Sequence, residues 1–290
     1  MTTTDVLTDA LTAYREGDTE AAAGHAAKAD SRLGTELATY LAGNTGGPVY
    51  DQPAAFTAFI RGGGNLELYR RLSAELARRY DDTRPESLLD LGCGDGLAVV
   101  PALELATHVP ARIDLVEPST ALLDAASERL DALDVEVSTF DDDAQDFLMM
   151  DAASEWALTQ STFALQSIPP ADRAEVLRTL RPRTGTLLLA EFDVPEYTEG
   201  SPEFLRSLVT RYERGIAEYG EQASLVAQGF LLPVLLGLVN AVNATAGRTN
   251  WEQPASAWVA ELEEAGYAEV GVELLADYWW SPAVLITASS

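Results

Sequence analysis

The segment ESLLDLGCGDGLAVV, residues 86–100, passes from an apolar run containing Asp90 into a turn with three glycines, and then into a second apolar run. This order predicts a strand, a tight turn and a helix. A turn of this kind exposes backbone N–H groups at the start of the helix, where they suit an anionic or polar part of a ligand. The segment therefore predicts a ligand site with Asp90 on one side and Asp95 on the other.

Short apolar runs alternate with helix-like stretches beyond residue 86. The runs are SLLDL, RIDLVE, VEVSTF, WALTQ and TLLLAEF, and the last two runs of the chain are AEVGVELLADYWW and SPAVLITAS. Strands that alternate with helices indicate βαβ units and a parallel sheet, whereas a short turn between the last two runs favours an antiparallel pair. We expect an α/β fold with a seven-stranded, mostly parallel sheet and an antiparallel terminal hairpin.

The chain is expected to have five segments. Residues 1–50 form an N-terminal helical region, 51–85 a helical cap segment, 86–193 the core, 194–255 a helical insertion after the fifth strand, and 256–290 the end of the core with its last helix and hairpin. Ligands in such sheets bind beyond the carboxyl ends of the strands. The insertion starts at that edge, so we expect it to act as a lid.

The bulk composition excludes several classes of protein. The net charge is −27, with 46 acidic and 19 basic residues, so the surface repels nucleic acid. The longest apolar stretch, GFLLPVLLGLV at 229–239, is too short to span a membrane and contains a proline. A polar, acidic N-terminus and a single cysteine fit a cytoplasmic protein without disulfides.

The glycine turn does not match the fingerprint of dinucleotide-binding enzymes. That fingerprint, G-x-G-x-x-G/A, would need glycine or alanine at position 97, which is leucine. Glu117 ends the second predicted strand, 21 residues after Gly96, and a carboxylate there can accept hydrogen bonds from a ribose. A turn residue next to a helix cap would explain Glu117 equally well when it is taken alone.

These motifs together resemble the class I S-adenosylmethionine-dependent methyltransferases, which have a Rossmann-like fold. LLDLGCGDG is similar to the first motif of that family, LVEPS to its acidic second-strand motif, and FDDDAQDF to its adenine-contact segment. The likeness covers about residues 86–193 and 256–290. The resemblance implies the cofactor S-adenosyl-L-methionine and a small-molecule acceptor.

The resemblance also implies the residues that bind the cofactor. Asp90 and the backbone of Gly92 and Gly94 would meet its methionine end, Glu117 with Pro118 its ribose, and Asp142 or Asp143 its adenine. Gln160 and Ser161, after the fourth strand, complete this set. Helix capping is the alternative for at least two of the aspartates at 141–143.

Methyl transfer from a sulfonium needs alignment of the acceptor and exclusion of water, and needs a general base only for some acceptors. Glu191, Asp193 and Gln160 are the candidate catalytic residues, with loop hydrogen bonding as the alternative role. The chain has two histidines and one cysteine, so no zinc spacing is present and no metal site is predicted.

Aromatic residues gather near the predicted strand ends and in the insertion, which favours a small, partly apolar acceptor such as a secondary metabolite. They are Phe163, Tyr197, Phe204, Tyr212, Tyr219, Phe230 and Trp251. The competing hypothesis is a non-catalytic S-adenosylmethionine-binding or protein-interaction module. The sequence leaves open the acceptor atom and whether the protein forms a homodimer.

Overall fold

The structure is a computed structural model that describes residues 2–43, 53–131, 133, 135–150, 153–240 and 250–289. The chain divides into two compact units, each built from three stretches of sequence. The sheet unit comprises Glu67–Pro195, Thr249–Asp277 and Pro282–Ser290. The helical unit comprises Met1–Leu66, Glu196–Arg248 and Tyr278–Ser281.

Seven strands form one sheet in the order β3-β2-β1-β4-β5-β7-β6. Their bounds are β1 Ser87–Leu91, β2 Arg112–Val116, β3 Glu136–Phe140, β4 Trp156–Thr162, β5 Thr184–Phe192, β6 Glu269–Ala276 and β7 Ala283–Ser289. Strands β1 to β5 pair in parallel, whereas β7 is antiparallel to both of its neighbours, β5 and β6. The predicted fold class is confirmed.

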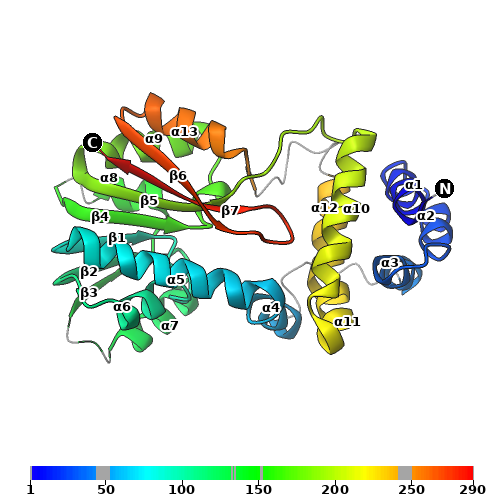
Figure 1. The fold of residues 1–290 in the computed structure, drawn as a ribbon, viewed down its shortest axis with the longest axis horizontal. Helices are drawn as coiled ribbons and strands as arrows, with labels where there is room; N and C mark the ends of the chain where they lie inside the picture. Colours follow the sequence, from blue (N-terminus) through cyan, green and yellow to red (C-terminus); the bar gives the residue numbers. More distant parts are fainter. Residues whose placement is uncertain are drawn as a thin grey trace. The chain divides into compact units, whose positions relative to one another are not determined.

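Helices cover both faces of the sheet, as Figure 1 shows. They are α5 Gly63–Thr83, α6 Val99–Leu105, α7 Thr120–Leu130, α8 Ala144–Met150, α9 Pro170–Leu180 and α13 Ala255–Glu264. Leu89 and Leu91 of β1 share a buried core with side chains of α8 and α9. Because side chains alternate along a strand, Asp90 points to the opposite face, where α5 packs.

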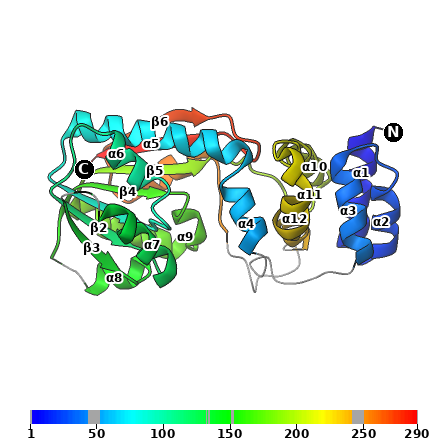
Figure 2. The same cartoon turned by 90° about the horizontal axis from the view of Figure 1, so that it is seen from below.

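The helical unit combines two segments that lie far apart in the sequence. Its helices are α1 Thr3–Arg15, α2 Thr19–Ala26, α3 Arg32–Gly43, α4 Pro53–Ile60, α10 Pro202–Ala217, α11 Ala223–Val226 and α12 Leu232–Asn240, with a π-helical turn, η5 Ala227–Leu231, before α12. Helices α1, α2 and α3 lie side by side in Figure 2. Helices α1 and α3 both contact α10, so the N-terminal region and the insertion after β5 share one core.

The predicted division into five segments follows the order of the sequence and stays a prediction, whereas the two compact units group residues by contact. The stretches Met1–Leu66 and Glu196–Arg248 belong to one unit, although they lie far apart in the sequence. Helix α5 runs without interruption through residue 66, where the two units meet along the chain. The predicted boundary between residues 50 and 51 lies outside the described residues.

One helical stretch, Gly220–Asn240, is long and apolar enough to cross a membrane by length and composition alone. It comprises η4 Gly220–Gln222, α11, η5 and α12. Half of its most apolar window is buried inside the protein, as in the core helix of a helical unit. The sequence-based expectation of no membrane partner stays a prediction.

Candidate active site

The glycine turn after β1 lies at the carboxyl edge of the sheet and has a left-handed backbone at all three glycines. Gly92, Gly94 and Gly96 have φ values of 71°, 56° and 73°. A Cβ on Gly92 would lie 2.4 Å from the Cβ of Ala164, and one on Gly96 would lie 2.8 Å from a methyl group of Val100. These two glycines are therefore needed for close packing within the protein itself.

Gly94 is different, because a Cβ there would have no atom within 4 Å. Its surroundings are open, while its backbone N–H donates to Oε2 of Glu117 at 3.1 Å. The other oxygen of Glu117 accepts from the N–H of Ser119 at 3.0 Å. The turn after β1 and the carboxylate after β2 thus meet at an open position.

Asp90 is a deeply buried acid at this edge. Its side chain is 1% exposed, its Oδ2 accepts from Nε2 of Gln160 at 3.0 Å, and its Oδ1 has no partner among the described residues. Burial raises its pKa to about 7 despite the bond from Gln160, and the nearby charge of Glu117 adds to the rise. A buried carboxyl with one unpaired oxygen is suited to a cationic ligand group.

Gln160 of β4 is fully buried and joins Asp90 to helix α5. Its Oε1 accepts from the hydroxyl of Tyr80 at 2.6 Å, while its Nε2 donates to Asp90. The structure therefore gives Gln160 a supporting contact with Asp90. Tyr80 was not predicted, because nothing near it in the sequence signals a partner eighty residues away.

The remaining predicted cofactor residues have varied positions. Ser161 is buried and donates to the carbonyl of Leu91 at 2.8 Å, which ties β4 to β1. Asp143 accepts from the N–H of Asp146 at 2.9 Å, the helix-capping role that was its alternative. Asp142 is half-buried and Pro118 is exposed, both directly after neighbouring strands. Asp142 is the better adenine candidate of the pair.

Glu191, near the end of β5, is a second buried acid with one unpaired oxygen. It is 1% exposed, its Oε1 accepts from the N–H of Gln166 at 3.3 Å, and its Oε2 has no described partner. Burial raises its pKa to about 8, helped by the charge of Glu252, and the charge of Arg173 only partly offsets this. Glu191 is therefore able to hold a proton near neutral pH.

Asp193, the other predicted carboxylate after β5, is already engaged. Its Oδ1 accepts from the N–H of Ala255, the first residue of α13, at 2.7 Å. This bond matches the structural alternative for Asp193. Next to it, Gln253 forms a β-bridge with Asp193, and the buried Gln253 Nε2 and Gln166 Oε1 lack described partners. Gln166 bonds to Glu191, and Gln253 lies on the segment that pairs with the end of β5, so we refer to Glu191, Gln166 and Gln253 as the strand-end cluster.

Arg173 of α9 fixes the loops that carry this cluster. Its side chain is fully buried, pairs with both oxygens of Glu261 at 2.8 and 2.7 Å, and lies 4.2 Å from the ring centre of Trp258. It also donates to the carbonyls of Leu165 and Trp251. The N–H of Trp251 donates to the carbonyl of Gln166, so the segment before α13 is held against the loop after β4.

Aromatic rings line the ends of β4 and β5. Phe163 has an unusual positive φ of 55° and stacks on Phe192, with ring centres 4.6 Å apart. Tyr69 of α5 meets Phe163 edge to face at 6.1 Å. Burial, with a smaller contribution from the charge of Asp95, raises the pKa of Tyr69 to about 12, so its hydroxyl stays protonated. Backbone strain of this kind is typical of functional sites.

The predicted aromatic set is divided between the two units. Phe163 and Trp251 belong to the sheet unit, whereas the other five belong to the helical unit. Tyr212 and Tyr219 are buried there, with Tyr212 packed against Trp279. Their role in the helical core agrees with the usual position of aromatics at helical spacing.

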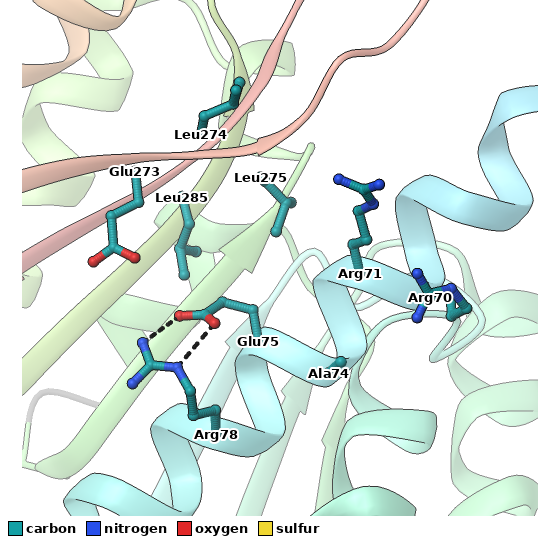
Figure 3. Close-up of a pocket in the computed structure, with 9 residues that line it drawn as sticks. All are labelled: Arg70, Arg71, Ala74, Glu75, Arg78, Glu273, Leu274, Leu275 and Leu285. Carbon is teal, nitrogen blue, oxygen red and sulfur yellow. Dashed lines mark hydrogen bonds and ion pairs between the residues drawn. The ribbon is translucent and has the colours of Figure 1, made fainter.

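A groove of about 400 Å³ lies elsewhere in the sheet unit, between α5 and the β6–β7 pair (Figure 3). Glu75 and Arg78 pair with each other inside it, whereas Arg70 and Arg71 both pair with Glu67, which is not part of its lining. None of the predicted site residues lines it. Among the described residues there is also no group of three or more His, Cys, Asp or Glu placed to hold a metal ion.

Comparison with known proteins agrees with this site. Residues 88–183 match the model of a methyltransferase domain family, and the match includes the glycine turn, Glu117 and β4. No curated protein is similar enough in sequence to stand as a relative. The sheet unit is a class I methyltransferase domain. The resemblance to S-adenosylmethionine-dependent methyltransferases is thereby confirmed, together with the type of cofactor that it implies.

Solved structures share the fold at low sequence identity. An O-methyltransferase family protein from Burkholderia thailandensis has a TM-score of 0.54 at 14% identity, over 96% of this chain and 70% of that one. Magnesium protoporphyrin IX methyltransferase from Synechocystis PCC 6803 with bound SAM has a TM-score of 0.50 at 11% identity, over 83% and 94%. The chain spans 63% of the length of a third structure, PigF with SAH.

Proposed function

We propose that the protein is a methyltransferase that binds S-adenosylmethionine and transfers its methyl group to a small-molecule acceptor by in-line displacement. The observation that carries this proposal is the open position at Gly94, which Glu117 contacts, in the turn that follows the buried and unpaired oxygen of Asp90. These groups fit a zwitterionic amino acid joined to a ribose. When bound, the cofactor supplies a methyl group on a positively charged sulfur.

The chain's own residues would divide the work of binding. Asp90 Oδ1 would accept from the cofactor's amino group, and the open surroundings of Gly94 would let the ligand approach the backbone closely. Glu117 would exchange its present backbone bonds for the ribose hydroxyls, and Asp142 would meet the adenine. The family resemblance supports each of these assignments.

The strand-end cluster and the aromatic rings support a small acceptor bound beside β4 and β5. Phe163 and Phe192 would contact an apolar part, and the unpaired atoms of Gln166 and Gln253 would contact polar groups. Glu191 is the best candidate for proton transfer, because its Oε2 is buried and unpaired. Asp193 and Gln160 would act by orienting neighbours, since both are bonded elsewhere.

Cofactor binding can be tested with Glu117→Ala. The change removes acceptors of charge-assisted hydrogen bonds, so we expect S-adenosylmethionine to bind about 10- to 150-fold more weakly by calorimetry, equivalent to roughly 1.5–3 kcal/mol. Asp124→Ala, in the adjacent helix α7, is the matched control and should bind as the unmodified protein does. Unchanged affinity of Glu117→Ala would remove the ribose assignment.

Turnover separates an enzyme from a binding module. Candidate acceptors with hydroxyl or amine groups are incubated with labelled cofactor, and methylated product is measured. For an active acceptor, Glu191→Gln should keep cofactor affinity and lower kcat about 10²- to 10⁴-fold if Glu191 transfers the proton. Cofactor binding with no methylated product across the acceptor panel would favour the interaction-module hypothesis, and an unchanged kcat in Glu191→Gln would exclude the base.

A further inference from the structure

We propose that Tyr80, acting through Gln160, is a positioning residue that favours the ionised form of Asp90 and aims it at the amino group of the cofactor. This inference rests on the proposed function, because it concerns the same binding site. It adds a residue from outside every motif of the sheet, on helix α5. The hydroxyl of Tyr80 bonds to Gln160 and not to Asp90 directly, so its influence on Asp90 passes through Gln160.

The three side chains form one continuous hydrogen-bonded chain inside the sheet unit. Tyr80 and Gln160 are fully buried, and Asp90 is 1% exposed. The hydroxyl of Tyr80 donates to Oε1 of Gln160 at 2.6 Å, and Nε2 of Gln160 donates to Oδ2 of Asp90 at 3.0 Å. Asp90 is the last member of this hydrogen-bonded series, and its Oδ1 has no partner among the described residues.

The direction of this chain matters, because the amide of Gln160 can face Asp90 in two ways. With its N–H₂ group toward Asp90, the amide donates a hydrogen bond to the ionised carboxylate, which can only accept. With its oxygen toward Asp90, it serves a protonated carboxyl group, which can donate. The hydroxyl of Tyr80 donates to Oε1 and thereby favours the first orientation. Phenylalanine would fill the same space without this preference.

The charged surroundings make Asp90 sensitive to such a preference. Glu117 after β2 opposes its ionisation, and the buried Cys93 of the glycine turn and Tyr80 of α5 carry raised pKa values, so both stay neutral beside it. Gln160 of β4 donates the bond that favours the charged form. With the pKa of Asp90 at about 7, both forms of the carboxyl are populated at neutral pH.

Binding of a cationic amino group should therefore release a proton from Asp90 to the solvent. Affinity for the demethylated cofactor should rise with pH from about 6 to about 8 and then level off, since the carboxyl is ionised above its pKa. Removing the hydroxyl of Tyr80 should move this rise to higher pH. A purely structural role of Tyr80 would instead weaken binding equally at every pH.

The experiment measures binding of S-adenosylhomocysteine by calorimetry across this pH range, in two buffers of different ionisation enthalpy. Tyr80→Phe should shift the midpoint upward by about 0.5–1 pH unit. The loss of affinity should then be about 2- to 6-fold at pH 7, about 3- to 10-fold at the acidic end of the range, and should vanish well above pH 8. Tyr267→Phe is the control, because Tyr267 is a buried tyrosine of the same unit whose hydroxyl has no described partner. It should show no shift.

Gln160→Leu provides a second variant with Tyr80 intact. It removes the bond to ionised Asp90, so we expect a larger upward shift and about 10- to 100-fold weaker binding at neutral pH. If Tyr80→Phe does not fold, as judged by its thermal unfolding, the shift in Gln160→Leu tests the chain. Normal binding by the unmodified protein with unshifted profiles in the folded variants would overturn this inference alone. Failure of the unmodified protein to bind would overturn the proposed function and this inference with it.

Discussion

Two buried acids stand at the carboxyl edge of the sheet, Asp90 in β1 and Glu191 in β5, and they are built in different ways. Each has one bonded and one unpaired oxygen, and burial raises the pKa of both. Asp90 is supported by side chains of neighbouring elements, Gln160 and Tyr80. Glu191 is supported by a backbone N–H of the loop after β4. The part of the edge around Asp90 is therefore held by helices and strands, and we call it the framework end. The part around Glu191 is held by loops, and we call it the loop end.

This difference matches the ligands proposed for the two parts of the edge, a cofactor near Asp90 and an acceptor near Glu191. Regular elements hold their side chains with little freedom, which suits an invariant cofactor. Loops tolerate changes in length and sequence, which suits an acceptor that differs between enzymes. Four measurements follow from this comparison, in order of expected effect.

The loop end should depend on Arg173, which joins α9, α13 and the segment at Trp251. Arg173→Met removes the bonds to Glu261 and to the buried carbonyls while keeping similar length. We expect a loss of about 3–5 kcal/mol in the free energy of unfolding, measured with denaturant. Arg178→Met, on the same helix with an exposed pair to Glu175, is the control and should lose less than about 1 kcal/mol. Similar losses in both would mean that Arg173 does not hold the loops.

The framework end can be examined with a pair of glycine variants. Gly92→Ala brings a Cβ against Ala164 and strains a left-handed backbone, so the free energy of unfolding should fall by about 2–4 kcal/mol. Gly94→Ala meets open space and should lose only about 1–2 kcal/mol of stability from backbone strain. The second variant should nevertheless bind S-adenosylmethionine more weakly, because its methyl group fills the open position. Normal affinity of Gly94→Ala for S-adenosylmethionine would contradict the proposal that the ligand occupies this open position.

Asp90 should make stability depend on pH. Its folded pKa of about 7 lies above the ordinary value of 3.8, so the folded protein favours the protonated carboxyl. The stability that this contributes is fully present below pH 3.8 and is lost as pH rises through about 7. Glu191, raised to about 8, acts with the same sign. In Asp90→Asn, the loss of unfolding free energy between about pH 5 and about pH 8 should be smaller than in the unmodified protein by roughly 2–3 kcal/mol. Equal pH slopes in the two proteins would show that Asp90 is already ionised.

Removal of metal ions should have the smallest effect. Both acids are proposed to act through protons and hydrogen bonds, and the described residues hold no cluster suited to a metal. Treatment with EDTA should therefore leave turnover unchanged once an acceptor is found. Activity lost with EDTA and restored by magnesium would show that the acidic residues after β3 were misread.

The two ends also differ in how far the sequence predicts them. Asp90, Gly94 and Glu117 lie in local motifs, because a tight turn and a strand end each need particular residues in consecutive positions. Their proximity follows directly from the parallel order of β1 and β2. Five strands and the terminal pair could be predicted for the same reason, since apolar runs and turns are local signals.

Other features depend on contacts between distant residues and could not be predicted. Tyr80 meets Gln160 only because α5 crosses the sheet over β4, and no local pattern encodes that crossing. Gln253 reaches Asp193 after an excursion of sixty residues. The joint core of residues 1–43 with the insertion after β5 likewise arises from the packing of amphipathic helix faces. The sequence of such a face does not indicate which other face it packs against.

The position of β7 has a consequence for how the chain is made. β7 lies between β5 and β6, although both precede it in the sequence. As the chain emerges from the ribosome, the outer backbone groups of β5 therefore stay unpaired through the synthesis of residues 193–282, and β6 has no strand to join. Open strand edges are templates for association with other chains. The arrival of residues 283–289 closes that edge and recruits β6 in the same step, so the edge of β5 stays open to other chains until β7 pairs with it.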